Sequence, residues 1–209
     1  MSVRSVSALA LGVLLVLAGC SDDGEPSSDG ATTQEDSSST PSGPTFTNFA
    51  DFPGDELMYF QNGVPTVAGL RLKAVDAVWQ VELADEVAAA GTHFLVVYVA
   101  VTGEMVDRSV ADARMYTTDF TLSLDATVVD PEHATTLEQV PDGEWRDYRW
   151  QFGDTPMAVD IAPGTTMISA VAFPVPDETP DPGALEFCAK DKDASMDNCV
   201  TVALPAEPR

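Results

Sequence analysis

The stretch HFLVVYVAV, residues 93–101, constrains the fold of this chain more than any other segment. It is continuously apolar and consists mainly of β-branched and aromatic residues, which favour strands. It is too short to cross a bilayer as a helix, which takes about 20 residues. A strand that is apolar on both sides needs cover on both faces. We therefore expect residues 93–101 to form a central strand that is buried on both faces.

Other segments alternate apolar and polar residues with a period of two. This alternation is typical of strands with one face on a core and one face in water. Pro-Gly and Asn-Gly pairs, which favour turns, separate the segments. There is no strand–helix–strand rhythm and no internal repeat. The sequence therefore predicts an all-β fold, an antiparallel immunoglobulin-like β-sandwich. Its further predicted strands include LRLKAV (70–75), TDFTLSLD (118–125), TMISAVAFPV (166–175), ALEFCA (184–189) and CVTVAL (199–204).

Helical signals are weak in this chain. ELADEVAAAG, residues 82–91, combines residues of good helix propensity with a glycine at its end, where helices commonly stop. DRSVADARMY, residues 107–116, is similar. Either segment is expected to form one or two helical turns between strands.

The first residues have the layout of a secretory signal: one positive charge at Arg4, a short apolar stretch and then small residues. The apolar stretch would span only about 16 Å as a helix, against about 30 Å of hydrocarbon. Leu17-Ala18-Gly19-Cys20 resembles a bacterial lipobox, in which the cysteine receives a diacylglycerol and the preceding peptide is removed. The resemblance implies a signal peptide at 1–19 and a chain tethered to the membrane by Cys20.

Residues 20–45 follow with no aromatic and no large aliphatic side chain. Such a segment cannot bury enough apolar surface to offset the entropy of ordering it. We expect a disordered linker over residues 20–45 and a single folded domain over residues 46–209. Together with the signal at 1–19, this linker predicts an extracytoplasmic domain held at the cell membrane by lipid.

The chain is strongly acidic, with 34 Asp and Glu residues against 10 Lys and Arg residues and a net charge of −24. Nucleic-acid binding depends on Lys and Arg that neutralise phosphates, so this charge argues against a nucleic-acid partner. It also argues against a domain lying flat on an anionic membrane. Cationic partners and divalent ions remain open, and a solvated acidic surface is the simplest interpretation. We expect a monomer.

If Cys20 is lipidated, Cys188 and Cys199 remain as a pair. A pair of cysteines in an exported chain predicts a disulfide bond, and two free thiols are the alternative. Closing a loop of this length would stabilise the fold by about 3 kcal/mol in the chain-entropy account.

Three stretches together resemble a bacterial family of secreted and lipid-anchored proteins: GTHFLVVYVAV, then DFTLSLD, then APGTTMISAVAFPVP followed by GALEF. The family comprises telokin-like or immunoglobulin-like sandwiches of unknown function, and the resemblance covers about residues 65–204. It implies a fold and transfers no catalytic residue. Two turns depart from the family pattern: Thr102-Gly103-Glu104 follows the long strand, and Asp125-Ala126-Thr127 lacks the usual glycine.

Signatures of catalysis are missing from the sequence. There is no G-x-S-x-G, no Ser-x-x-Lys, no phosphate-binding loop and no dinucleotide fingerprint. The two histidines, His93 at the start of the long strand and His133 in an expected loop, do not have ligand spacing. We therefore expect no enzyme, no cofactor and no metal centre of histidine type.

CAKDKDASMDNC, residues 188–199, partly follows a calcium-loop pattern. Asp191, Asp193, Ser195 and Asp197 occupy the first ligand positions, but Met196 and Val202 replace the required glycine and glutamate. A helix–loop–helix calcium site is excluded, and a hairpin tip closed by the disulfide is expected. A weak calcium site with oxygen ligands is the remaining alternative.

EWRDYRWQF, residues 144–152, concentrates aromatic and basic residues in an acidic chain. If this stretch is a strand, its two faces carry different aromatics, and a sandwich buries only one of them. Exposed Trp, Tyr and Arg are common anchors of binding surfaces, whereas buried core aromatics are the simpler alternative. We predict a recognition surface for an acidic peptide or a glycan made of Trp145, Arg146, Tyr148, Arg149 and Trp150, with at least one tryptophan exposed.

These features favour a cell-envelope lipoprotein that presents a non-catalytic sandwich domain for binding an envelope protein or glycan. A structural envelope protein without a ligand is the alternative, and a small extracytoplasmic enzyme is a weaker one because no nucleophile or cofactor motif supports it.

Overall fold

The computed structural model describes residues 48–61, 69–84, 86–190 and 198–206, all within the compact unit Pro41–Arg209. The predicted signal peptide, Cys20, the linker and the candidate calcium ligands at 191–197 lie outside the described residues. Among the described residues, no helix has the length and apolar character needed to cross a bilayer.

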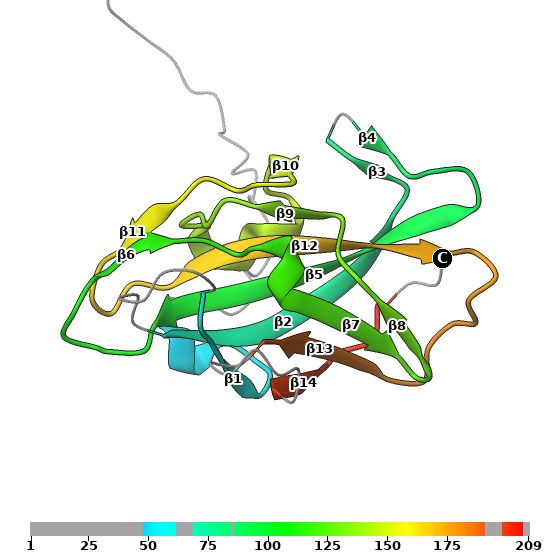
Figure 1. Ribbon diagram of the computed structural model, residues 1–209. Helices are drawn as coiled ribbons and strands as arrows, with labels where there is room; N and C mark the ends of the chain where they lie inside the picture. Colours follow the sequence, from blue (N-terminus) through cyan, green and yellow to red (C-terminus); the bar gives the residue numbers. More distant parts are fainter. Residues whose placement is uncertain (1–47, 62–68, 85, 191–197, 207–209) are drawn as a thin grey trace, which may run out of the picture. The chain divides into compact units, whose positions relative to one another are not determined.

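The larger sheet has six strands, joined throughout by antiparallel pairing (Figure 1). Its three long central strands have the most apolar sequences, as the period-two and continuous patterns predicted. In spatial order the strands are β1 (Glu56–Tyr59), β2 (Leu70–Gln80), β5 (Thr92–Gly103), β12 (Met167–Pro176), β9 (His133–Thr135) and β10 (Phe152–Gly153).

A four-stranded antiparallel sheet packs on one face of the larger sheet, so the domain is an antiparallel β-sandwich, as predicted (Figure 1). Its strands are β14 (Asn198–Val202), β13 (Leu185–Ala189), β7 (Phe120–Leu124) and β8 (Thr127–Val129). Two short ladders pair β11 (Val159–Ile161) with β6 (Val110–Ala113) and β3 (Glu82–Leu83) with β4 (Glu86–Val87). Three 3₁₀ helices complete the described elements: η1 (Phe49–Asp51), η2 (Thr117–Asp119) and η3 (Pro141–Arg146).

The main core lies between the two sheets and contains the apolar members of the alternating segments. Leu70, Leu72 and Ala74 of β2 and Leu122 and Leu124 of β7 all belong to this core. Their polar neighbours along each strand are more exposed, which is the alternation expected of half-buried strands.

A second core covers the opposite face of the larger sheet. Alternate residues of β5 separate accordingly: Val97 and Val99 belong to the main core, whereas Val96 and Tyr98 belong to the second. This confirms the prediction of a central strand buried on both faces. The cover of the second core consists of Phe49 and Phe52 around η1, Leu83 of β3, and Trp145 and Trp150 in and after η3.

A bulge in β2 lets consecutive residues of this strand contribute to both cores. The register of β2 against β5 shifts between Ala74 and Asp76, so Val75 is an extra residue. Before the bulge Ala74 faces the main core, and after it Ala77 does. Val75 packs in the second core, and Asp76 is left at its margin. Bulges commonly redirect a side chain in this way.

The helical predictions for 82–91 and 107–116 are wrong. The first segment contains the β3–β4 hairpin, which extends beyond the end of β2 in Figure 1, and the second contains β6. In both cases strand pairing overrides modest helix propensity: β4 pairs with β3 in a local hairpin, and β6 pairs with β11, which is distant in sequence. His133, expected in a loop, is the first residue of β9.

The turn Asp125-Ala126-Thr127, between β7 and β8, forms without the glycine of the family pattern. Asp125 adopts a positive φ of 50°, a conformation that Asp tolerates better than most residues. Its carboxylate oxygens accept hydrogen bonds from the backbone N–H groups of Gly183 (2.8 Å) and Ala184 (3.1 Å). These bonds fix the β7–β8 turn against the start of β13.

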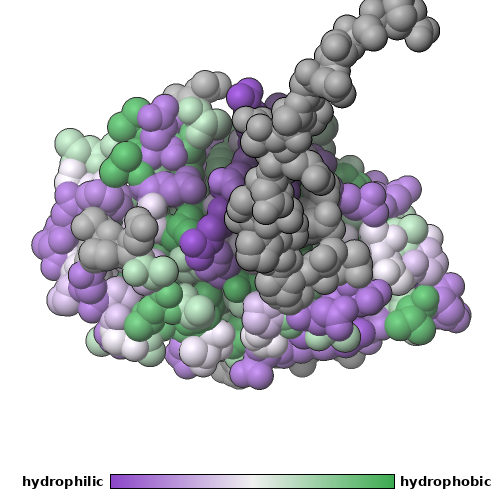
Figure 2. Space-filling view, turned by 180° about the vertical axis from the view of Figure 1, so that it is seen from behind, coloured by the Kyte–Doolittle hydropathy of each residue, from purple (hydrophilic) through white to green (hydrophobic). Residues whose placement is uncertain are grey.

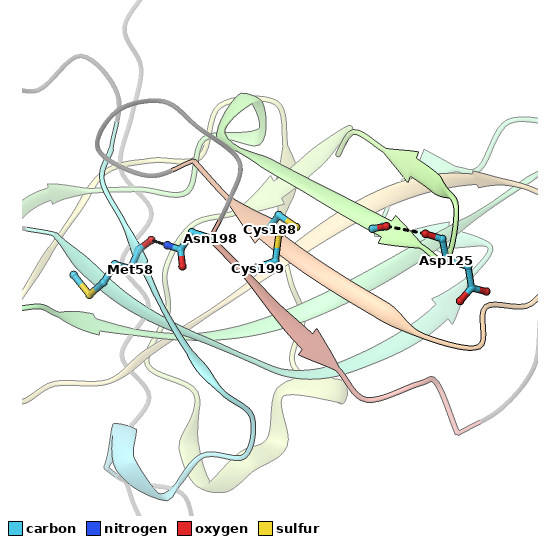
Figure 3. The surroundings of a disulfide bond; sticks show 6 residues. Met58, Asp125, Cys188, Asn198 and Cys199 are labelled. Atoms are coloured by element: carbon cyan, nitrogen blue, oxygen red, sulfur yellow. Dashed lines mark hydrogen bonds between the residues drawn. A yellow bond between two sulfur atoms is a disulfide. The ribbon is translucent and has the colours of Figure 1, made fainter.

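Cys188 and Cys199 form the predicted disulfide bond, joining directly opposed positions of β13 and β14 (Figure 3). Beside it, the side-chain amide of Asn198 donates a hydrogen bond to the backbone carbonyl of Met58 on β1. The amide therefore links the edge strands of the two sheets next to the disulfide.

We expect thiol reagents to modify neither Cys188 nor Cys199 in unreduced, denatured protein. Replacing both by Ala should lower the free energy of unfolding by about 3 kcal/mol, because the unfolded chain regains the entropy of the closed loop. Mass spectrometry after labelling and urea unfolding would measure the two effects. Labelling of both cysteines without reduction would contradict the pairing.

Burial in the second core, together with the nearby carboxylate of Asp76, raises the pKa of Tyr98 from 10.0 to about 12. The unfolded chain therefore loses this proton first as pH rises, so the contribution to stability is complete below pH 10 and is lost between pH 10 and about 12. We expect Tyr98→Phe to reduce the loss of stability across this interval by about 2–3 kcal/mol. Urea unfolding at pH 9 to 12 would measure the loss of unfolding free energy in the unaltered protein and in Tyr98→Phe. Equal losses in the two proteins would show that the Tyr98 hydroxyl is exposed to solvent.

Candidate functional site

The stretch 144–152 does not form the predicted strand. Residues up to Arg146 belong to η3, a turn follows, and only Phe152 enters a strand, β10. Trp145 and Trp150 are 8% and 7% exposed. The prediction that one tryptophan is exposed is therefore wrong. The physical reason is that this stretch is itself a cover over the larger sheet, so both indole rings point toward the sheet.

Contacts between aromatic rings hold this cover in place. The ring centroids of Trp145 and Phe52 lie 6.0 Å apart, and those of Trp150 and Tyr98 lie 6.3 Å apart. Trp150 Nε1 donates a hydrogen bond of 2.8 Å to the backbone carbonyl of Trp145. The buried indole N–H is thereby satisfied within the cover.

Asp76, placed by the bulge in β2, fixes the cover to the sheet. Its carboxylate accepts hydrogen bonds from Arg146 Nε (2.5 Å) and Nη2 (2.7 Å) and from Trp145 Nε1 (3.1 Å). A two-pronged arginine–carboxylate contact fixes orientation as well as distance. Arg146, predicted to bind a ligand, is therefore engaged in holding the fold.

The remaining predicted residues, Tyr148 and Arg149, line a surface pocket of about 150 Å³ beside the cover. Tyr148 is half-buried, with its ring centroid 4.7 Å from that of Trp150. The opposite wall comes from the end of β9 and the chain that follows it. The full lining is Thr135, Thr136, Glu138, Tyr148, Arg149, Trp150, Gln151 and Met157.

Arg149 differs from the other arginines around the larger sheet. Arg71 pairs with Glu56 at 2.6 Å, and Arg146 pairs with Asp76. Within residues 48–61, 69–84, 86–190 and 198–206, Arg149 has neither a carboxylate partner nor a side-chain hydrogen bond. Its exposed guanidinium keeps its donors for a partner from solution.

The pocket offers several kinds of polar group at short range. Arg149 supplies donors only, the Glu138 carboxylate accepts, and the Gln151 amide and Thr136 hydroxyl can do both. Tyr148 adds an aromatic surface. The volume lies below the 300–1,000 Å³ typical of sites for drug-sized ligands. The site is therefore suited to one ring or one terminal group of a larger molecule.

The two histidines lie in different surroundings. His93 Nδ1 contacts Asp177 at 2.5 Å in an exposed pair. His133 is buried beside carboxylates from other segments, including Glu86 of the β3–β4 hairpin. Sequence spacing gave no sign of this cluster, because the hairpin was expected to be helical and Glu86 is distant in the chain.

No protein-family model matches this chain, and no curated protein matches it. A similar solved structure is the crystal structure of an uncharacterized β-sandwich protein from Clostridium difficile 630. It shares 9% identity, with 68% of this chain and 91% of that chain covered and a TM-score of 0.37. The assignment to the β-sandwich class follows from the two packed sheets described above.

We expect Asp76→Ala to loosen the cover over the second core, because it removes the acceptor shared by Trp145 and Arg146. The free energy of unfolding should fall by about 1.5–3 kcal/mol, and tryptophan fluorescence should shift to the red. Asp130→Ala, which removes an exposed carboxylate just after β8, is the matched control. An unchanged emission maximum in Asp76→Ala would show that the Asp76 contact does not hold the cover.

Proposed function

We propose that this protein is a cell-envelope lipoprotein that uses the pocket beside Arg149 to bind a saccharide unit of an envelope glycan without catalysis. The anchor in this proposal is Cys20, supported by the Leu17-Ala18-Gly19-Cys20 sequence and its resemblance to lipid-anchored sandwich proteins. The β-sandwich then acts as a rigid support for a recognition site on its cover.

The observation that carries the proposal is the guanidinium of Arg149, which has no carboxylate partner among the described residues of a chain with 34 acidic residues. With so many carboxylates available, an arginine kept apart from all described ones retains its capacity for a ligand. The Glu138 carboxylate on the same pocket disfavours a strongly anionic ligand and favours hydroxyl groups, which both accept and donate. A sugar ring supplies such hydroxyls, together with an apolar face for Tyr148.

Binding without hydrolysis fits the composition of the pocket. Most glycoside hydrolases place two carboxylates on opposite sides of the bond that breaks. Among the described residues lining this pocket, Glu138 is the single carboxylate. The face in Figure 2 interleaves hydrophilic residues with small groups of hydrophobic ones. This pattern fits a solvated domain that presents one local site.

Binding to purified cell-wall glycan fragments tests the proposal. We expect Arg149→Ala to weaken binding about 10-fold or more, equivalent to about 1.4 kcal/mol, because it removes the charged donor. Arg108→Ala is the matched control, since Arg108 is also exposed and its loss changes the net charge equally. Equal binding by both variants would refute the site. Binding of acidic peptides in place of glycans would assign the pocket to a peptide, and binding of neither would favour a structural role.

We expect Cys20→Ala to move the protein from the membrane fraction to the medium or to leave an unprocessed precursor, because the acyl anchor cannot form. Immunoblots of fractionated cells would show the distribution and the mobility. Unchanged membrane association together with unchanged mobility would contradict lipid anchoring.

A further inference from the structure

His133 occupies an unusual position at the margin of the second core. It is 7% exposed, and its ring packs edge-on against Phe94 with centroids 6.1 Å apart. Both ring nitrogens are fully shielded from solvent, and neither makes a hydrogen bond of acceptable geometry within the described structure. A buried polar group without a hydrogen bond is costly and requires an explanation.

Carboxylates surround this ring. His133 Nε2 lies 3.0 Å from Glu86 Oε2, and Nδ1 lies 3.2 Å from Asp154 Oδ1. Glu132 is adjacent in sequence, and ligand atoms of Glu86, Glu132 and His133 all lie within 4.8 Å of one another. The short distances without hydrogen-bond geometry mean that the carboxylates lie beside the ring nitrogens rather than in line with them.

The fold brings these residues together from three segments. Glu86 lies on β4, in a hairpin that Leu83 anchors in the second core. Glu132 is held by its backbone N–H, which donates to the carbonyl of Ala172 on β12 at 2.9 Å. Asp154 follows β10, whose pairing with β9 places it next to His133. Glu86 and Glu132 are both exposed, so their side chains can adjust.

We propose that Glu86, Glu132 and His133 Nε2 form a binding site for a divalent transition-metal ion of the zinc type. Zn²⁺ binds imidazole nitrogen and carboxylate oxygen at about 2.0–2.2 Å, which sets neighbouring ligand atoms of a tetrahedral site roughly 3.3–3.6 Å apart. Nε2 and Glu86 Oε2 lie 3.0 Å apart, so a small outward adjustment of the exposed Glu86 side chain would bring them to this separation. Two carboxylates and a neutral imidazole balance the charge of a divalent ion, and water completes the coordination.

Asp154 has the role of an outer partner in this site. Histidine ligands generally donate their second ring N–H to a carboxylate or carbonyl, which fixes the tautomer that presents the other nitrogen to the metal. Asp154 Oδ1 lies 3.2 Å from Nδ1, where a small rotation of its exposed side chain would complete this bond. With Glu86 as a metal ligand beside Nε2 and Asp154 as the acceptor for Nδ1–H, the site accounts for a carboxylate at each ring nitrogen.

The imidazole selects the class of ion. Ca²⁺ and Mg²⁺ prefer all-oxygen sites, whereas Zn²⁺ and its neighbours among the transition metals bind imidazole well. A bound ion would join the β3–β4 hairpin to β9 through Glu86 and His133. The site lies outside the saccharide pocket, so it is independent of the proposed function.

Calorimetric titration of chelator-treated, full-length protein with ZnCl₂ in excess MgCl₂ tests the site. Magnesium occupies weak sites on the acidic surface. We expect one zinc ion per chain in the low micromolar range or tighter. Glu86→Gln and Glu132→Gln should each weaken binding roughly 10-fold or more, and Asp154→Asn should weaken it by about 10-fold. Glu186→Gln, an exposed carboxylate on β13, should bind as the unaltered protein does.

Zinc X-ray absorption provides a second measurement that needs no substitution of the buried histidine. We expect nitrogen and oxygen ligands with the scattering pattern of one imidazole. Absence of stoichiometric zinc binding, equal affinity in Glu86→Gln and Glu186→Gln, or a zinc spectrum without imidazole would each overturn the proposal. In those cases the contacts of His133 with Glu86 and Asp154 would have a structural role only.

Discussion

Burial of both faces of the central sheet is the constraint on which the rest of this structure depends. β5 carries large apolar residues on each side, so one packing partner cannot satisfy it. The four-stranded sheet covers one face, and η1, the β3–β4 hairpin and the segment around η3 cover the other. The second cover is assembled from short irregular pieces, which need specific polar contacts, such as that between Asp76 and Arg146, to stay in place.

The second cover determines which polar groups remain available. It uses Trp145, Trp150 and Arg146 for packing and anchoring, and it leaves Arg149 facing solvent beside a small pocket. The same short strand, β9, contributes to both proposed sites. Thr135 at its end lines the pocket, and His133 at its start meets the carboxylates. The edge of the larger sheet is therefore where the cover ends and where binding chemistry can reach the surface.

The sequence predicted the regular part of this fold well and the cover poorly. Strands such as 93–101 and 118–125 were predictable because alternation and continuous apolarity directly report burial on a pleated sheet. The role of 144–152 was not predictable, because its aromatics have no single period and its partner Asp76 is placed by a bulge far away in sequence. The disulfide followed from cysteine count, whereas the surroundings of His133 depended on the hairpin and on the pairing of β9 with β10. For 144–152 and for the surroundings of His133, contacts distant in sequence decided the outcome.

The central claim is that the segment around η3 covers the second face of the larger sheet and leaves Arg149 and its pocket open. Hydroxyl-radical footprinting of the native protein with mass spectrometry tests this claim most directly, because it reports the exposure of each aromatic and Met side chain in solution. The account predicts strong protection of Trp145 and Trp150, with ready oxidation of Met157, which is 71% exposed at the pocket. Oxidation of both tryptophans at the rate of exposed residues would show that the second core does not form.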